Sequence, residues 1–244
     1  MSILLKDIHD NGTIKFTQDH YTSTMVFIGF NTVFLFFGIL LETLVIASIL
    51  RVRQKTVDTL FVLSLCCADL IFNLFQIIAQ PLLLNARGWS TGRLGCQFSV
   101  AIIIVTLATS ISSITFITLN RYLAIIWKRN ITRNQALVMI GFTWISLTTI
   151  VTLYLTNKEL AENSVALQSP YSYCLLDYTS RDPVVVTTLI TTLCFMSLPF
   201  LFMTIAYTQI ILYYRKMNRK KKKVDSKVLL YKLHRIQNSN RHTN

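Results

Sequence analysis

Five long, predominantly apolar segments constrain the fold of this chain more than any other feature of its sequence. A helix that crosses a membrane needs about 20 predominantly apolar residues, because each residue adds about 1.5 Å across a hydrocarbon core about 30 Å thick. Every one of these segments reaches that length. They cover residues 25–50, 59–84, 97–127, 135–155 and 183–214. The sequence therefore predicts an all-α fold, a multi-pass transmembrane helix bundle with five spans.

The charged residues of the chain are few and mostly basic. Only 14% of its 244 residues are charged and the formal net charge is +13, whereas about 25% of the residues of a soluble domain are charged. This composition disfavours a soluble globule and a disordered chain. Lys and Arg accumulate on the cytoplasmic side of membrane proteins. With the N-terminus outside the cell, 18 of the 24 basic residues fall on the inner side and 6 on the outer side, so this orientation is favoured. We expect a plasma-membrane protein with an extracellular segment 1–24, a membrane domain 25–216 and a basic cytoplasmic tail or inner-loop remnant at 217–244.

Two short motifs lie outside the apolar segments. Asn11-Gly12-Thr13 is a sequon for N-glycosylation and falls on the predicted outer face. The basic run 219–223 falls just inside the membrane. There, attraction to anionic lipids, about 1 kcal/mol per basic residue, is favoured over the binding of nucleic acid. The sequence therefore predicts a glycoprotein whose basic tail contacts anionic lipid.

Two acidic residues fall near the middle of predicted spans, Glu42 in the first and Asp69 in the second, and Ser110 adds polarity in the third. An ionisable residue inside a membrane costs several kcal/mol unless it is paired or hydrated, so each one marks a candidate site. Two interpretations stay open at this point. The residues either make interhelical hydrogen bonds, or they form a hydrated polar core that binds a sodium ion or a proton. No other metal and no cofactor are expected.

The five cysteines fall into two groups. Three of them lie within spans, where a thiol behaves as a small apolar side chain. Cys96 lies at the predicted outer end of the third span, and Cys174 lies in the outer loop after the fourth. Both face an oxidising compartment, and no other outer cysteine competes for either one. We therefore expect a disulfide between them, which would hold that loop over the mouth of the bundle.

Several motifs follow one another in an order and spacing that resemble the rhodopsin-like (class A) G-protein-coupled receptors. The second span reads LSLCCADL around Asp69, which is similar to the LSLAxAD of that family. The third span begins at Cys96 and ends in Asn120-Arg121-Tyr122, which looks like the family's DRY box. Further markers of the same resemblance are Trp89, Trp144, Pro199 and Tyr207. The resemblance covers about residues 25–216.

The resemblance implies a receptor that senses an extracellular ligand and signals to a heterotrimeric G protein, with a second receptor as a further partner. The residues that it carries over to a ligand pocket are Ile103, Leu107, Thr191 and Phe195. Those that it carries over to the inner switch are Asn120, Arg121, Tyr122 and Tyr207. Ile111 and Pro199 correspond to the packing relay between the two. Because Ile103 stands where amine receptors have an aspartate, the resemblance argues against a monoamine ligand.

The chain also departs from the family pattern. Asn120 replaces the acid that usually pairs with the following arginine, so we expect Arg121 to lose one restraint and basal activity to be higher. Glu42 replaces an asparagine, which places a second acid near Asp69. Lys128 replaces a proline in the second inner loop. Five spans instead of seven lead us to expect a fragment or a truncated gene product.

Two other functions stay open beside receptor signalling. Glu42 and Asp69 would also suit a proton- or cation-linked transporter, although the spans lack the paired Gly- or Pro-broken helices of an inverted repeat. A truncated receptor that does not signal would instead associate with full-length receptors. An enzyme is not expected, because the four histidines lie outside the spans and no phosphate-binding Gly-rich loop is present.

Overall fold

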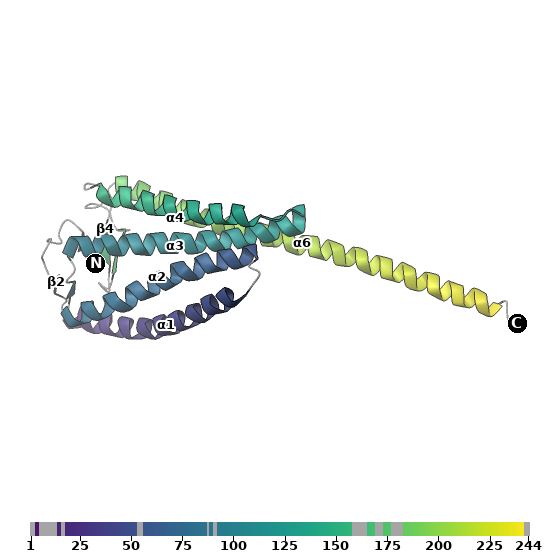
Figure 1. The fold of residues 1–244 in the computed structure, drawn as a ribbon, viewed down its shortest axis with the longest axis horizontal. Coiled ribbons are helices and arrows are strands. Elements are labelled where there is room, and N and C mark those ends of the chain that lie inside the picture. The colour runs from purple at the N-terminus through teal and green to yellow at the C-terminus, as the bar shows by residue number, and fades with distance from the viewer. Residues whose placement is uncertain are drawn as a thin grey trace.

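The computed structural model describes residues 3–4, 14–15, 18–52, 56–86, 88–89, 92–157, 165–168, 173–176 and 183–241. Its main feature is a bundle of long helices (Figure 1). These are α1 (Gln18–Arg51), α2 (Val57–Ala86), α3 (Gly92–Tyr122), α4 (Arg133–Thr156) and α6 (Pro183–Arg241), with a turn of π-helix, η2 (Leu123–Trp127), directly after α3. Within the described residues, 5 helices are long and apolar enough to cross a membrane. The predicted all-α bundle with five spans is therefore confirmed.

Helix α3 occupies the middle of the bundle. It packs against α2, α4 and α6, while α1 packs against α2. Small and hydroxyl-bearing side chains allow this close packing, and Ala108, Ser113 and Thr118 of α3 are almost fully buried. The hydroxyl of Thr118 donates a 3.0 Å hydrogen bond to the carbonyl of Ile114 one turn back, and the hydroxyl of Ser113 donates to Ser64 on α2.

The helices extend further than the apolar segments that predicted them. The expected fifth span ended at 214, but α6 runs on without a break to Arg241. Lys, Arg and Leu are good helix formers, and no Gly or Pro follows Pro199 within α6. The third span was expected to be helical to 127, but its last turn is a π-helix. That turn ends at Lys128, which adopts a left-handed conformation with φ of 53°.

Short strands lie beyond the helix ends at the end of the bundle that holds Cys96, which we call the disulfide end. β4 (Val165–Gln168) and β5 (Tyr173–Leu176) form an antiparallel hairpin, and β1 (Ile3–Leu4) pairs with β4. A second pair joins β2 (Ile14–Lys15) to β3 (Gly88–Trp89), so that Trp89 lies opposite Ile14. Strands this short have too few residues to produce an alternating pattern, which is why the sequence did not predict them.

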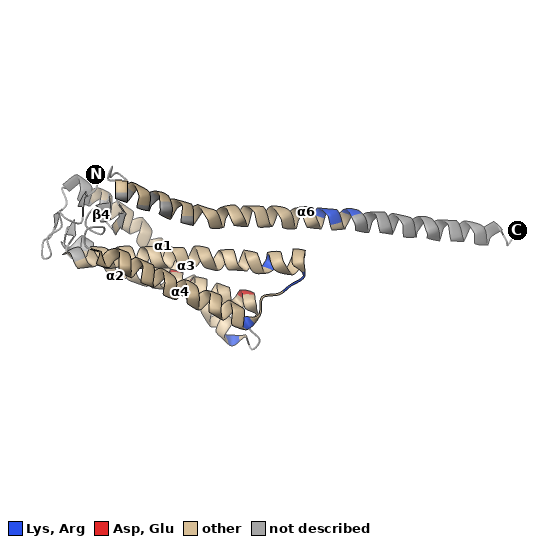
Figure 2. Ribbon diagram, turned by 90° about the horizontal axis from the view of Figure 1, so that it is seen from above, with Lys and Arg blue, Asp and Glu red and all other residues tan. Residues whose placement is uncertain are grey.

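The opposite end of the bundle holds Arg121, and we call it the arginine end. In Figure 2 the Lys and Arg residues drawn in blue gather on this side, beside the α3–α4 connection and along α6. A compact apolar cluster lies here, made of the buried Leu60, Phe61 and Ala136. The ring of Phe116 packs on Phe61, with 5.4 Å between ring centroids. The cluster joins the first turns of α2 and α4 to the last turns of α3.

Candidate functional site

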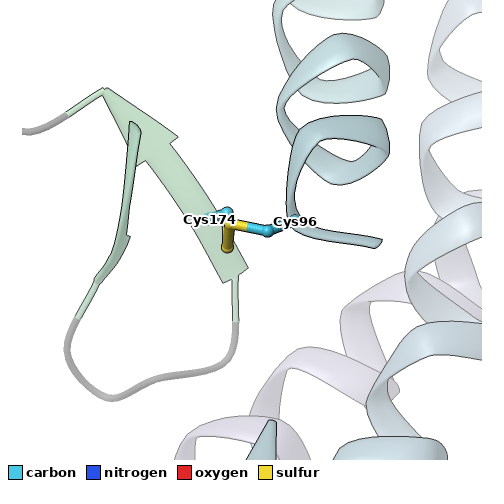
Figure 3. The surroundings of a disulfide bond; sticks show 2 residues. All are labelled: Cys96 and Cys174. Atoms are coloured by element: carbon cyan, nitrogen blue, oxygen red, sulfur yellow. A yellow bond between two sulfur atoms is a disulfide. The ribbon is translucent and has the colours of Figure 1, made fainter. Parts of the chain in front are cut away.

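A disulfide joins Cys96 at the start of α3 to Cys174 on β5, as predicted (Figure 3). The two Cα atoms are 5.3 Å apart, and both cysteines are completely buried. The bond closes a loop between positions 78 residues apart in the sequence. It therefore holds the β4–β5 hairpin against the disulfide end of α3.

At the arginine end, the side chains of Asn120 and Arg121 meet a carboxylate from α2. Asn120 Nδ2 donates a 2.6 Å hydrogen bond to Asp58 Oδ1, and Arg121 Nε lies 3.7 Å from Asp58 Oδ2. Arg121 therefore has an ionic partner on α2, although position 120 supplies no acid. The bundle brings this acid to Arg121 from 63 residues away along the chain, which the adjacent residues do not reveal.

The next residue of α3 connects that helix to α6. Tyr122 Oη donates a 2.6 Å hydrogen bond to Gln209 Oε1. Tyr207, which we expected in the same switch, is 42% exposed, and within the described residues its hydroxyl has no hydrogen-bond partner. Gln209 thus links α6 to the Asn120-Arg121-Tyr122 motif through a side-chain hydrogen bond. No signal in the sequence distinguished it from the other polar residues of this segment.

The two acidic residues in the middle of the bundle have separate partners. Asn73 Nδ2 donates to both carboxylate oxygens of Glu42, at 2.9 Å and 3.1 Å, and so joins α1 to α2. Ser110 Oγ donates a 2.5 Å hydrogen bond to Asp69 Oδ1 and joins α2 to α3. Of the two interpretations left open, the interhelical hydrogen bonds are present. Among the described residues, no group of three or more His, Cys, Asp or Glu side chains could hold a metal ion.

Gly38 allows α1 to approach α2 closely at the Glu42–Asn73 contact. A Cβ atom at Gly38 would lie 3.0 Å from Asn73 Nδ2, whereas one at Gly29, on the same helix, would have no atom within 4 Å. A helical Gly→Ala change normally stabilises a protein by about 0.5–1 kcal/mol. We expect that gain for Gly29→Ala, and no gain or a loss for Gly38→Ala, because Asn73 must move away from Glu42. Thermal unfolding in detergent measures both, and equal gains would contradict the argument.

Trp144, a marker of the family resemblance, ties α4 to the centre of the bundle. Its Nε1 donates a 3.2 Å hydrogen bond to Ser64 Oγ on α2, and Ser113 Oγ of α3 donates to the same oxygen at 3.3 Å. Ser64 is 7% exposed, so its hydroxyl finds both partners inside the bundle. In the part of the chain that the structure describes, Thr109 Oγ1 is the buried side-chain polar atom without a partner.

The other candidate residues are placed as follows. Ile103 is partly buried and Leu107, one turn further along α3, is 52% exposed. Ile111 and Pro199 are partly buried, on α3 and α6 respectively. The backbone of Thr191 and Phe195 belongs to α6, but their side chains and the sequon at Asn11 lie outside the described residues. The ligand-pocket candidates therefore stay predictions.

Five helices of membrane-spanning length and composition, joined by polar pairs, indicate a multi-pass membrane protein. Comparison with known proteins gives its family. Residues 42–242 match the family described as 7 transmembrane receptor (rhodopsin family). The chain belongs to this family of seven-transmembrane receptors.

Its relatives agree with that assignment. The muscarinic acetylcholine receptor M3 of Rattus norvegicus is 30% identical over 132 residues, which are 52% of this chain and 22% of that receptor. The muscarinic acetylcholine receptor M1 of Homo sapiens is 29% identical over 127 residues, 50% of this chain and 28% of that receptor. The crystal structure of squid rhodopsin has the same fold, with a TM-score of 0.69 at 19% identity over 85% of this chain and 56% of that one. The matched part is thus less than a third of either muscarinic receptor.

Proposed function

We propose that this protein is a G-protein-coupled receptor of the plasma membrane, with the disulfide end outside the cell and the arginine end in the cytoplasm. One observation carries the proposal. Helix α3 of a rhodopsin-family chain bears the disulfide-tethered hairpin in its second turn, at Cys96, and the Asn120-Arg121-Tyr122 motif in its last. The basic residues at the arginine end support this orientation, because cytoplasmic faces are rich in Lys and Arg.

The ligand would bind among the helix ends beneath the β4–β5 hairpin, with Ile103 and Leu107 of α3 and Thr191 and Phe195 of α6 in the pocket wall. The muscarinic relatives are named for acetylcholine, which is a cation. Ile103 offers no carboxylate to pair with a cationic ligand, so we do not extend acetylcholine to this chain. An uncharged or apolar ligand fits the two α3 side chains better.

At the cytoplasmic end, Arg121 would contact the G protein. Its side chain is 56% exposed, so it is accessible to a partner. We also propose that the basic run 219–223 contacts anionic lipid and that Asn11 carries a glycan. Binding of a sodium ion or a proton near Asp69 is a further proposal. A transporter is not proposed, because Glu42 and Asp69 are each bonded to a neutral side chain of an adjacent helix.

To test this proposal, the protein is expressed in cells from its own gene, and nucleotide exchange is measured on a co-expressed heterotrimeric G protein. We expect exchange above that of untransfected cells, and a loss of about tenfold or more in Arg121→Ala, which removes the residue placed against the G protein. Arg133→Ala is the matched control, because Arg133 is an exposed residue at the same end of the bundle. Exchange no higher than in untransfected cells, or equal losses in both variants, would contradict the proposal.

A further inference from the structure

Asp58 faces two successive residues of α3 with its two carboxylate oxygens. Oδ1 accepts the hydrogen bond from Asn120 at 2.6 Å, and Oδ2 lies 3.7 Å from Arg121 Nε. We propose that Asp58 is the positioning residue for Arg121. It supplies the negative charge that holds the guanidinium group, while Asn120 orients the carboxylate.

The amide of Asn120 is occupied on both sides. Its Nδ2 donates to Asp58, and its Oδ1 accepts a 3.4 Å hydrogen bond from the backbone N–H of Ile131. The amide carries no charge, so it cannot neutralise Arg121. It instead links the start of α2 to the segment before α4 and holds Asp58 Oδ1 toward itself. The other oxygen, Oδ2, is thereby directed at Arg121.

The restraint on Arg121 is weak enough to be released. A distance of 3.7 Å between Nε and Oδ2 is longer than a hydrogen bond, so the contact is an ion pair. The two side chains are 56% and 35% exposed, and ion pairs in such surroundings restrain weakly. Asp58 therefore sets the resting position of Arg121 without preventing the guanidinium from moving to a partner.

A competing explanation assigns Asp58 to α2 alone. The residue lies in the first turn of α2, where an acid stabilises the positive end of the helix dipole. The two explanations differ when the charge is moved. Asp58→Asn removes the charge from both the helix and Arg121, whereas adding Asn120→Asp returns a carboxylate to the side of Arg121 and leaves the first turn of α2 without one.

The experiment measures the reactivity of Arg121 toward phenylglyoxal in the purified protein, reconstituted in lipid nanodiscs, by mass spectrometry of the modified peptides. We expect Asp58→Asn to raise the modification rate of Arg121 by roughly two- to fivefold, the change that corresponds to loss of an exposed ion pair. The double variant Asp58→Asn with Asn120→Asp should return the rate to that of the native protein. Arg133 of the same samples is the internal reference and should not change.

An unchanged Arg121 rate in Asp58→Asn would overturn the proposal, as would a raised rate that the double variant fails to restore. An equal rise at Arg133 would also overturn it, because it would indicate loosening of the whole end of the bundle. The role of this contact in signalling rests on the function proposed above, but the reactivity of Arg121 is measured without a G protein. Failure of signalling and failure of the positioning contact are therefore distinguishable.

Discussion

Replacing Cys174 with serine is expected to lower the free energy of unfolding by about 4 kcal/mol. The reason is the length of the loop that the Cys96–Cys174 bond closes, because a cross-link between positions 78 residues apart strongly restricts the unfolded chain. The measurement is unfolding of the purified protein in detergent, followed by the loss of helical circular dichroism. Native protein treated with a reducing agent should fall to the stability of the variant, and the reductant should not destabilise the variant further.

Cys194→Ser provides the matched control, since Cys194 is an exposed free cysteine on α6. We expect this change to alter the free energy of unfolding by less than about 0.5 kcal/mol. The double variant of Cys96 and Cys174 should be no less stable than Cys174→Ser alone, because both remove the same bond. Equal losses in Cys174→Ser and Cys194→Ser would show that the serine itself, and not the missing cross-link, causes the effect.

The sequence was sufficient to predict the features that depend on the composition of long segments. The five spans follow from runs of apolar residues, each long enough to cross the membrane whatever its neighbours are. The Cys96–Cys174 pair followed from elimination, because no other cysteine was placed on the same side. These predictions needed no knowledge of how the helices face one another.

The contacts between helices could not be predicted in the same way. The Asp58–Arg121 pair and the Tyr122–Gln209 hydrogen bond join residues that are far apart in the sequence. Whether such residues meet depends on the rotation and the depth of each helix, and the apolar spans fix neither. Asp58 lies in the first turn of α2, a position that an acid favours for local reasons, so nothing in the sequence marked it as a partner of Arg121. Sequence reasoning therefore found the arginine but missed the acid that faces it.

Polar contacts join α2 to α3 at two depths of the bundle, and in both the acid comes from α2. Asp69 meets Ser110 in the middle of the bundle, and Asp58 meets the Asn120 side chain at the arginine end. Both acids belong to α2, so this helix supplies the negative charge and α3 supplies the donors. Because α2 and α3 are joined at both depths, we expect them to move as one unit. A shift of α3 at one depth should therefore displace α2 at the other.

The apolar cluster at the arginine end is expected to hold that unit together, and Phe61→Ala tests it. Phe61 is completely buried and packs on Phe116, so its removal leaves a cavity between α2, α3 and α4 and should cost about 3–5 kcal/mol of unfolding free energy. Phe142→Ala removes the same atoms from a side chain that is 72% exposed on α4, and should cost less than about 1 kcal/mol. Thermal unfolding of both variants in the same detergent gives the comparison. If Phe142→Ala cost as much as Phe61→Ala, the stability of this end would depend on contacts outside the cluster. Asp58 lies three residues before Phe61 on α2. In that case the packing of the Phe61 ring would not be what holds Asp58 beside Asn120.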